Sequence, residues 1–70
     1  MILSDIDKSI LDILKKAKRP LSTYQIAKKA KITWPTANTH CYKLMSVKLV
    51  LNRQEESKHG SKEKMVWWLK

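Results

Sequence analysis

The chain has 70 residues, a mass of 8.2 kDa and a hydrophobic fraction of 43%, which together predict one small folded domain. No apolar run approaches the roughly 18–20 residues that cross a bilayer, no export signal opens the chain, and the single Cys41 fits a reducing compartment. We therefore expect a soluble cytoplasmic protein without a membrane partner. The net charge of +9 favours a polyanionic partner, nucleic acid first, over a merely solvated surface. Residues 15–31 hold seven of the cations and no acid, so the charge forms a patch.

The first helix is predicted over about residues 4–18. Ser4 followed by Asp7 matches a capping box, and Pro20 ends the helix after a run of cations that suits its C-terminal dipole. Asp5 and Asp7 are expected simply to complement the N-terminal dipole. The inward stripe is formed by apolar residues at helical spacing, namely Ile6, Ile10, Ile13, Leu14 and Ala17.

Two further helices follow closely. Ser22 opens a helix over about 22–30 with a second capping box, and Thr33 caps a third helix over about 33–46 that accepts Pro35 in its first turn. The residues predicted to face inward are Ile26, Ala27 and Ala30 in the former, and Ala37, Cys41, Leu44 and the aliphatic stem of Lys48 in the latter.

The pattern becomes extended after the third helix. Residues 49–70 predict a two-stranded hairpin whose polar turn, 57–62, contains the only glycine of the chain. Alternation assigns side chains to two faces of the last strand. The core face receives Met65, Trp67 and Leu69, and the opposite face receives Val66, Trp68 and Lys70.

Residues 21–50 resemble the second and third helices of MarR- and ArsR-like transcription regulators. The matching positions are Ile26-Ala27, Thr33-Trp34-Pro35-Thr36, Leu44 and Leu49-Val50. With the first helix and the hairpin, the resemblance extends over nearly the whole chain. It implies an α+β, mostly helical fold, a three-helix winged helix-turn-helix with a C-terminal two-stranded β-hairpin wing, as a single domain over 1–70. It also implies double-stranded DNA binding by a small transcription regulator, associated with the nucleoid if the source is prokaryotic.

Two features depart from these regulators. They usually carry glycine at the positions of Lys31 and Lys48, where the chain leaves a helix with positive φ, so lysine there is expected to cost roughly 1 kcal/mol. They also tend to have arginines in the third helix, whereas this helix holds only Lys43. The second departure weakens the expectation of strong sequence-specific contacts.

The resemblance implies that the third helix enters the major groove while the wing contacts a flanking groove or the backbone. Asn38 would then bond adenine N6 and N7, and the Tyr42 hydroxyl would donate to a phosphate. The residues expected around the bases are Thr33, Trp34, Thr36, Asn38, Thr39, Tyr42 and Lys43. Those expected to pair with phosphates regardless of sequence are Lys28, Lys29, Lys58, Lys62 and Lys64.

Several aromatic and polar residues also have a structural interpretation. Thr33 is expected to be an N-cap in any case, and Trp34 either packs over the turn or contacts the groove. His40 is expected to be a partly covered structural residue. Trp67 is expected in the core, and Trp68 at the base of the wing, on a partner surface or as a stacking platform for a base.

No metal, cofactor or catalytic site is predicted. His40 and Cys41 are adjacent and His59 is distant, which matches no zinc-ligand spacing. The chain has no glycine-rich loop for a phosphate, and Cys41 lies on an inward stripe, where a thiolate is disfavoured. We therefore expect a binding module without an effector-ligand switch.

Two other functions stay open. Asn38 and Tyr42, together with a wing tryptophan, resemble the contact set of Z-alpha domains, which bind left-handed duplexes. Those domains usually also have a lysine near the position of Trp34 and a Pro-Pro turn before the wing tryptophan, and both are missing here. The other function is a protein-interaction module of a replication, transcription or RNA-processing assembly, with Trp34, Trp68 and Val66 exposed. A homodimer or a larger protein assembly is compatible with either.

Overall fold

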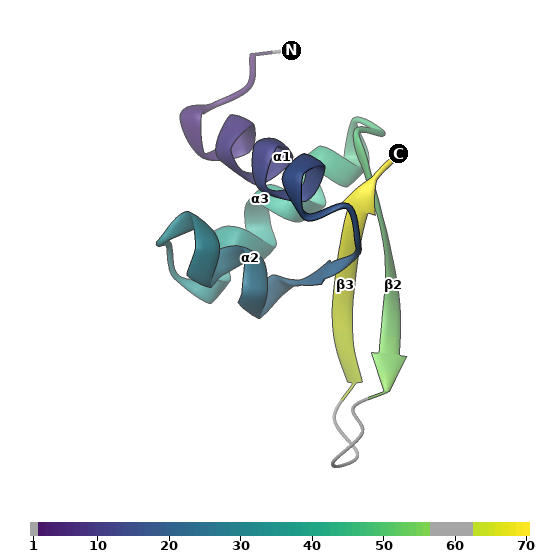
Figure 1. Cartoon of the computed structure of the whole chain (residues 1–70). Helices are drawn as coiled ribbons and strands as arrows, with labels where there is room; N and C mark the ends of the chain where they lie inside the picture. The colour runs from purple at the N-terminus through teal and green to yellow at the C-terminus, as the bar shows by residue number, and fades with distance from the viewer. Residues whose placement is uncertain (1, 57–62) are drawn as a thin grey trace.

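The computed structural model describes residues 2–56 and 63–70, in which three helices pack beside a three-stranded antiparallel sheet (Figure 1). In chain order the elements are α1 (Asp5–Ala17), β1 (Leu21–Ser22), α2 (Thr23–Ala30), α3 (Trp34–Ser46), β2 (Val50–Glu56) and β3 (Glu63–Leu69). The strand order is β1-β3-β2, and the hairpin of β2 and β3 extends beyond the helices (Figure 1). The turn predicted at 57–62 lies outside the described residues. No helix in the described ranges has the length and apolar character of a bilayer span.

Side-chain caps begin all three of these helices. The Ser4 hydroxyl accepts a hydrogen bond from the Asp7 amide at 3.1 Å, and the Asp7 carboxylate accepts one from the Ser4 amide at 2.9 Å. Ser22 caps α2 by the same reciprocal arrangement, with a glutamine as its partner. Thr33 Oγ1 accepts from the Thr36 amide at 3.4 Å at the start of α3. Each cap satisfies amides that the first helical turn leaves without a partner, and the three predicted caps are confirmed.

Left-handed residues lead the chain out of its helices. The φ angle is 58° at Lys31 and 65° at Lys48, the two positions where the resemblance predicts positive φ, and it is 55° at Lys18, which was not predicted. A Cβ atom makes this conformation cost roughly 1–2 kcal/mol, which glycine would avoid. The placement of Lys48 on the inward stripe of the third helix was wrong. α3 ends at Ser46, and Lys48 lies exposed in the turn that reverses the chain toward β2.

The core lies between the helices and one face of the sheet. Its buried members are Ile10, Leu14, Leu21, Ile26, Ala27, Ala37, Cys41, Leu44, Val50 and Trp67. Trp67 is the largest of them, and its indole Nε1 donates a hydrogen bond of 2.9 Å to the Thr23 hydroxyl, so its polar atom is satisfied. Burial of a tryptophan removes roughly 150–250 Å² from water, which stabilises the fold by an upper estimate of roughly 4–6 kcal/mol. The predicted core positions of Cys41 and Trp67 are confirmed.

The sheet differs from the predicted hairpin in two respects. The two-residue strand β1 pairs with β3, with Leu21 opposite Trp67, so the sheet has a third strand that was not predicted. Val66, predicted on an exposed face, is only 3% exposed because β3 is the central strand and has neighbours on both edges. This burial removes Val66 from the predicted protein-interaction surface. Met65 and Leu69, predicted in the core, are half-buried at its margin.

Candidate nucleic-acid interface

The surface of α3 divides into two stripes on either side of its buried face. Residues three or four apart lie on the same side of a helix. The stripe nearer β3, the hairpin-side stripe, consists of Trp34, Asn38 and Tyr42. The stripe nearer α1, the α1-side stripe, consists of Thr36, His40 and Lys43. The predicted contact residues therefore fall on two sides of α3 with different surroundings.

The hairpin-side stripe is positioned by the sheet. The Tyr42 ring meets Trp67 edge-on, with 5.0 Å between the ring centroids and an interplanar angle of 89°. This geometry is the favourable edge-to-face arrangement of aromatic rings, and it leaves 40% of Tyr42 exposed. Asn38 lies one turn before Tyr42 and is half-buried, and Trp34 lies one turn before Asn38 and is exposed. The stripe thus offers a polar amide between two aromatic side chains, one of which is held in a fixed orientation.

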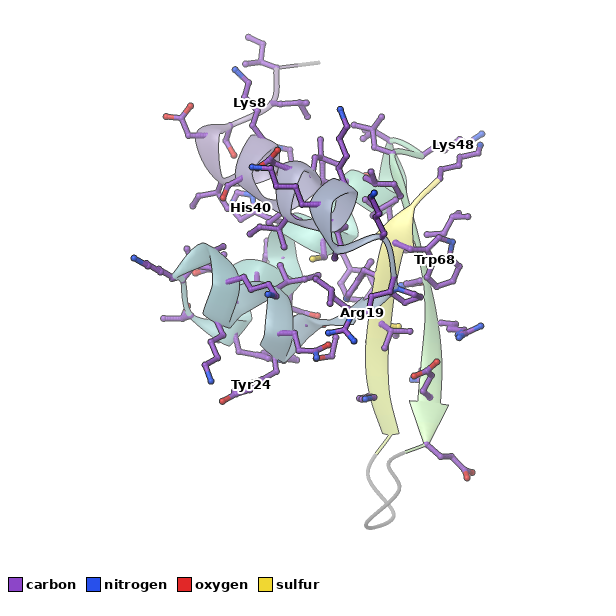
Figure 2. All side chains as sticks on the ribbon, in the orientation of Figure 1. Lys8, Arg19, Tyr24, His40, Lys48 and Trp68 are labelled. Atoms are coloured by element: carbon purple, nitrogen blue, oxygen red, sulfur yellow. The ribbon has the colours of Figure 1, made fainter. Side chains whose placement is uncertain are left out.

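A groove of about 500 Å³ lies beside this stripe. Its lining comes from β1, α2, α3 and β3 and consists of Ser22, Thr23, Tyr24, Gln25, Trp34, Lys64 and Met65. Tyr24 was missed by the sequence analysis, yet it is 65% exposed and points outward from the start of α2 (Figure 2). The exposed rings of Tyr24 and Trp34 suit contacts to sugars and bases, and the ammonium of Lys64 suits a contact to a phosphate. The only sequence signal for Tyr24 is an aromatic residue off the inward stripe of a short helix.

The α1-side stripe is engaged by the buried carboxylate of Asp7. Lys43 Nζ donates to Asp7 Oδ2 at 2.6 Å, and His40 Nδ1 donates to Asp7 Oδ1 at 2.7 Å. The Asp7 side chain is 0% exposed, so its role extends well beyond the helix dipole that the sequence analysis assigned to it. The structural role predicted for His40 is confirmed, and Figure 2 shows His40 next to α1. The ammonium of Lys43, the only cation of α3, is committed to this contact.

The ionisation of Asp7 is secured by its partners. Burial alone would raise the pKa of the Asp7 carboxyl, but hydrogen bonds from Lys43, His40 and Ser4 outweigh burial and hold the pKa far below its ordinary value. Asp7 is therefore an anion at neutral pH. Within the described ranges every buried side-chain nitrogen and oxygen has a hydrogen-bond partner. These charge-assisted bonds fix the orientation of α3 relative to α1.

The predicted threonines Thr33, Thr36 and Thr39 differ in whether their hydroxyl groups are free to bond a ligand. Thr33 Oγ1 accepts from the Thr36 amide and donates to Thr36 Oγ1 at 2.9 Å, so this hydroxyl is used by the cap. Thr39 is exposed on the outward ridge between the two stripes. It borders a shallow hollow of about 270 Å³ with Pro35 and His40. Thr39 is therefore the threonine that α3 presents most directly to a ligand.

The lysines predicted to pair with phosphates are distributed around the molecule. Lys28 lies one helical turn after Tyr24, on the side of α2 that borders the groove described above. Lys64 lines that groove. Lys29 instead lines a separate hollow of about 360 Å³, together with residues of α1 that include Asp12. Two further predicted residues lie outside the described part of the chain, Lys58 and Lys62.

Comparison with known proteins identifies the fold. No protein-family model and no curated protein matches the chain in sequence. Its structure is similar to that of a possible transcriptional regulator from Methanosarcina mazei Go1, with a TM-score of 0.85 and 16% identity over 97% of this chain and 57% of that one. It is also similar to ZitR, a zinc-responsive MarR family member of Lactococcus lactis, with a TM-score of 0.74 and 21% identity over 100% and 45% of the two chains. The chain is a winged helix.

A third structural neighbour differs from these two in its extent. The Zalpha domain of PKZ from Carassius auratus, solved in complex with Z-DNA, has a TM-score of 0.72 and 26% identity over 93% of this chain and 92% of that one. This winged helix therefore spans nearly the whole Zalpha domain, but only 57% of the Methanosarcina protein and 45% of ZitR. β2 and β3 form the wing, and α3 is the helix beside it.

Proposed function

We propose that this winged helix binds double-stranded DNA and acts as a small transcription regulator, with α3 in the major groove and the wing on the backbone. The proposal is supported above all by the composition of the α3 surface. Asn38, Thr39 and Tyr42 are uncharged hydrogen-bonding side chains on α3, whereas the exposed cations Lys28 and Lys64 belong to α2 and β3, and Lys64 lines a groove with Trp34 of α3. Amide and hydroxyl side chains of a helix in the groove can discriminate base edges, and lysines on the flanking elements can pair with phosphates irrespective of sequence.

The fold supports this division because α3 is held rigidly. Asp7 fixes one side of the helix through Lys43, and Trp67 fixes the other through Tyr42. A preorganised helix loses little conformational entropy when it enters a groove. Asn38 is then available for the two-point contact to adenine N6 and N7, a pairing worth roughly 1–3 kcal/mol of discrimination.

The proposal concerns a binding module rather than an enzyme. The most nucleophilic side chain type in the chain, the thiol of Cys41, is fully buried, and burial raises its pKa to about 12. A thiol with that pKa is almost entirely protonated at neutral pH and is a poor nucleophile.

Selection of bound duplexes from a random pool tests the proposal. Asn38→Ala is expected to change which sequences are enriched, because it removes a base-edge contact. Lys64→Ala is expected to weaken binding to all sequences alike and to lower the slope of log affinity against log salt by about 1. Lys8→Ala, at an exposed position on α1, is the matched control and should do neither (Figure 2). Unchanged sequence preference in Asn38→Ala would refute the assignment of α3, and absence of duplex binding even at low salt would favour a protein partner instead.

A second candidate function is binding of left-handed duplexes. The observation that favours it is the contact of Tyr42 with Trp67, a tryptophan of the wing, with Asn38 one helical turn before Tyr42, because these residue types resemble the Z-alpha contact set. The extensive match to a Zalpha domain solved with Z-DNA adds support. Trp34 stands where those domains usually have a lysine, so a ring would replace a phosphate-binding cation.

Circular dichroism of a CG-repeat duplex titrated with the protein separates the two candidates. Inversion of the spectrum, lost in Tyr42→Ala, would support the left-handed duplex. Tight binding of mixed-sequence duplexes without inversion of the CG-repeat spectrum would support the right-handed major groove.

A further inference from the structure

A second groove lies where α1 ends, beside the last residues of β3. It has a volume of about 580 Å³ and is lined by Leu14, Lys15, Lys18, Arg19, Pro20, Arg53, Trp68 and Leu69. Neighbouring residues of a strand point to opposite faces of the sheet, so Trp67 faces the core and Tyr42 whereas Trp68 faces this groove. A ligand here would therefore leave the hairpin-side stripe of α3 free.

The floor of this groove is formed by the apolar side chains of Leu14, Pro20, Trp68 and Leu69. The Arg53 guanidinium lies 5.6 Å from the centre of the Trp68 ring, in cation–π contact. Glu55 holds that guanidinium in place, because its Oε2 accepts from Arg53 Nη2 at 2.7 Å and from Nε at 3.2 Å. Leu51 is paired with Trp68 across the strands and is exposed, so it extends the apolar surface beyond the groove.

The rim of the groove carries cations without carboxylate partners. Lys15, Lys18 and Arg19 are exposed, and the ion pairs among residues 2–56 and 63–70 include none of the three. No Asp or Glu lines the groove. Three unpaired cations around an apolar hollow create a local field that attracts anions.

We infer that this groove binds an acidic segment of a protein partner, with an apolar side chain in the hollow and its flanking carboxylates on the cationic rim. Carboxylates match Lys15, Lys18 and Arg19 in charge, and an apolar side chain matches the floor. A nucleic acid matches less well, because Arg53 already covers a face of the Trp68 ring on which a base would stack. A second copy of the chain is disfavoured by repulsion, since each copy carries a net charge of +9.

The occupant is tested with a fluorescein-labelled peptide in which one phenylalanine is flanked by aspartates, measured by anisotropy and by amide chemical shifts of the protein. We expect binding that shifts the resonances of Arg19 and Trp68. Arg19→Glu combined with Lys18→Glu should weaken it by about tenfold or more. The matched control with the same change in charge is Lys8→Glu combined with Lys31→Glu, both at exposed positions outside the groove, and it should change the affinity by no more than about twofold.

Three results would overturn the inference. The first is equal binding of a peptide with serine in place of phenylalanine, which would mean that the apolar floor is unused. The second is equal weakening by the two double variants, which would mean that the peptide responds only to net charge. The third is displacement of the peptide by a DNA duplex together with the same pattern of shifts, which would assign the groove to nucleic acid. Failure of duplex binding at α3 would leave the inference intact, because the two sites share none of these residues.

Discussion

Replacement of Asp7 by asparagine tests how the orientation of α3 is maintained. Asp7→Asn keeps the size of the side chain and one oxygen acceptor, but it removes the charge that Lys43 and His40 share. A hydrogen bond to a charged group contributes roughly 1.5–3 kcal/mol. Because 40% of the Lys43 side chain is exposed and its ammonium can be rehydrated, we take the lower end for both bonds and expect a loss of about 3 kcal/mol.

That loss is large for a domain of this size. Stabilities of roughly 0.05–0.15 kcal/mol per residue give a 70-residue chain about 4–10 kcal/mol in total. A loss of about 3 kcal/mol therefore corresponds to a fall in melting temperature of roughly 12–24 °C. Asp5→Asn, in the same helical turn but exposed, changes the net charge equally and should cost no more than about 0.5 kcal/mol.

The pH dependence gives the prediction a second, independent measurement. The pKa of Asp7 is depressed in the folded state relative to about 3.8 in the unfolded chain. The contribution of Asp7 to stability is therefore complete above the unfolded pKa and is lost as pH falls toward the folded pKa. The difference in unfolding free energy between wild type and Asp7→Asn should thus be constant near neutral pH and shrink below about pH 4, by at most 1.4 kcal/mol per unit. Urea unfolding at pH 7, 5, 4 and 3 measures it. A difference under about 0.5 kcal/mol at pH 7, or one that does not change down to pH 3, would refute this account of Asp7.

Three further predictions follow from the fold. Lys48→Gly should raise the unfolding free energy by about 0.5 kcal/mol, because relief of the left-handed strain exceeds the entropy that glycine adds to the unfolded chain. Lys8→Gly within α1 should lower the unfolding free energy by about 1 kcal/mol. Equal effects of the two substitutions in urea unfolding would contradict this. Native Cys41 should resist iodoacetamide at pH 8 and react once guanidinium unfolds the chain, since burial raises its pKa to about 12; rapid labelling of the folded protein would show that the thiol is accessible. Trp67→Phe keeps a ring against Tyr42 but leaves the Thr23 hydroxyl without its donor. Thermal unfolding should therefore show a loss of roughly 1–3 kcal/mol in unfolding free energy. An unchanged melting temperature would mean that the hydrogen bond from Trp67 to Thr23 contributes nothing to stability.

The features that could be predicted from the sequence depend on neighbours in the chain. The caps at Ser4, Ser22 and Thr33 involve partners three residues away, so the spacing alone reveals them. The inward residues of α3 repeat at helical spacing for the same reason. The left-handed residues Lys31 and Lys48 followed from the resemblance, because lysine itself gives no indication of positive φ.

The features that were missed depend on long-range contacts. Asp7 contacts His40 and Lys43, which lie 33 and 36 residues later in the chain. The capping box explains an aspartate at this position by itself, so the sequence gives no reason to expect the buried ion pair. A helical wheel separates the two sides of α3, but it does not show which side meets α1 and which meets β3. Strand β1 has only two residues, too few for alternation to be visible, and the buried Val66 lies opposite Ser22 of that strand.

The pairing of β1 with β3 also decides which functions the two adjacent tryptophans can serve. Leu21 lies opposite Trp67, and Thr23, two residues later, accepts the hydrogen bond from the Trp67 indole, so two contacts specify one register. A slip by one residue would exchange the faces of β3 and place Trp68 against Tyr42. The same short strand therefore keeps Trp67 as the support of α3 and Trp68 in the cationic groove. The proposed nucleic-acid surface and the inferred protein site therefore depend on two neighbouring residues of one strand, Trp67 and Trp68, whose side chains point to opposite faces of β3.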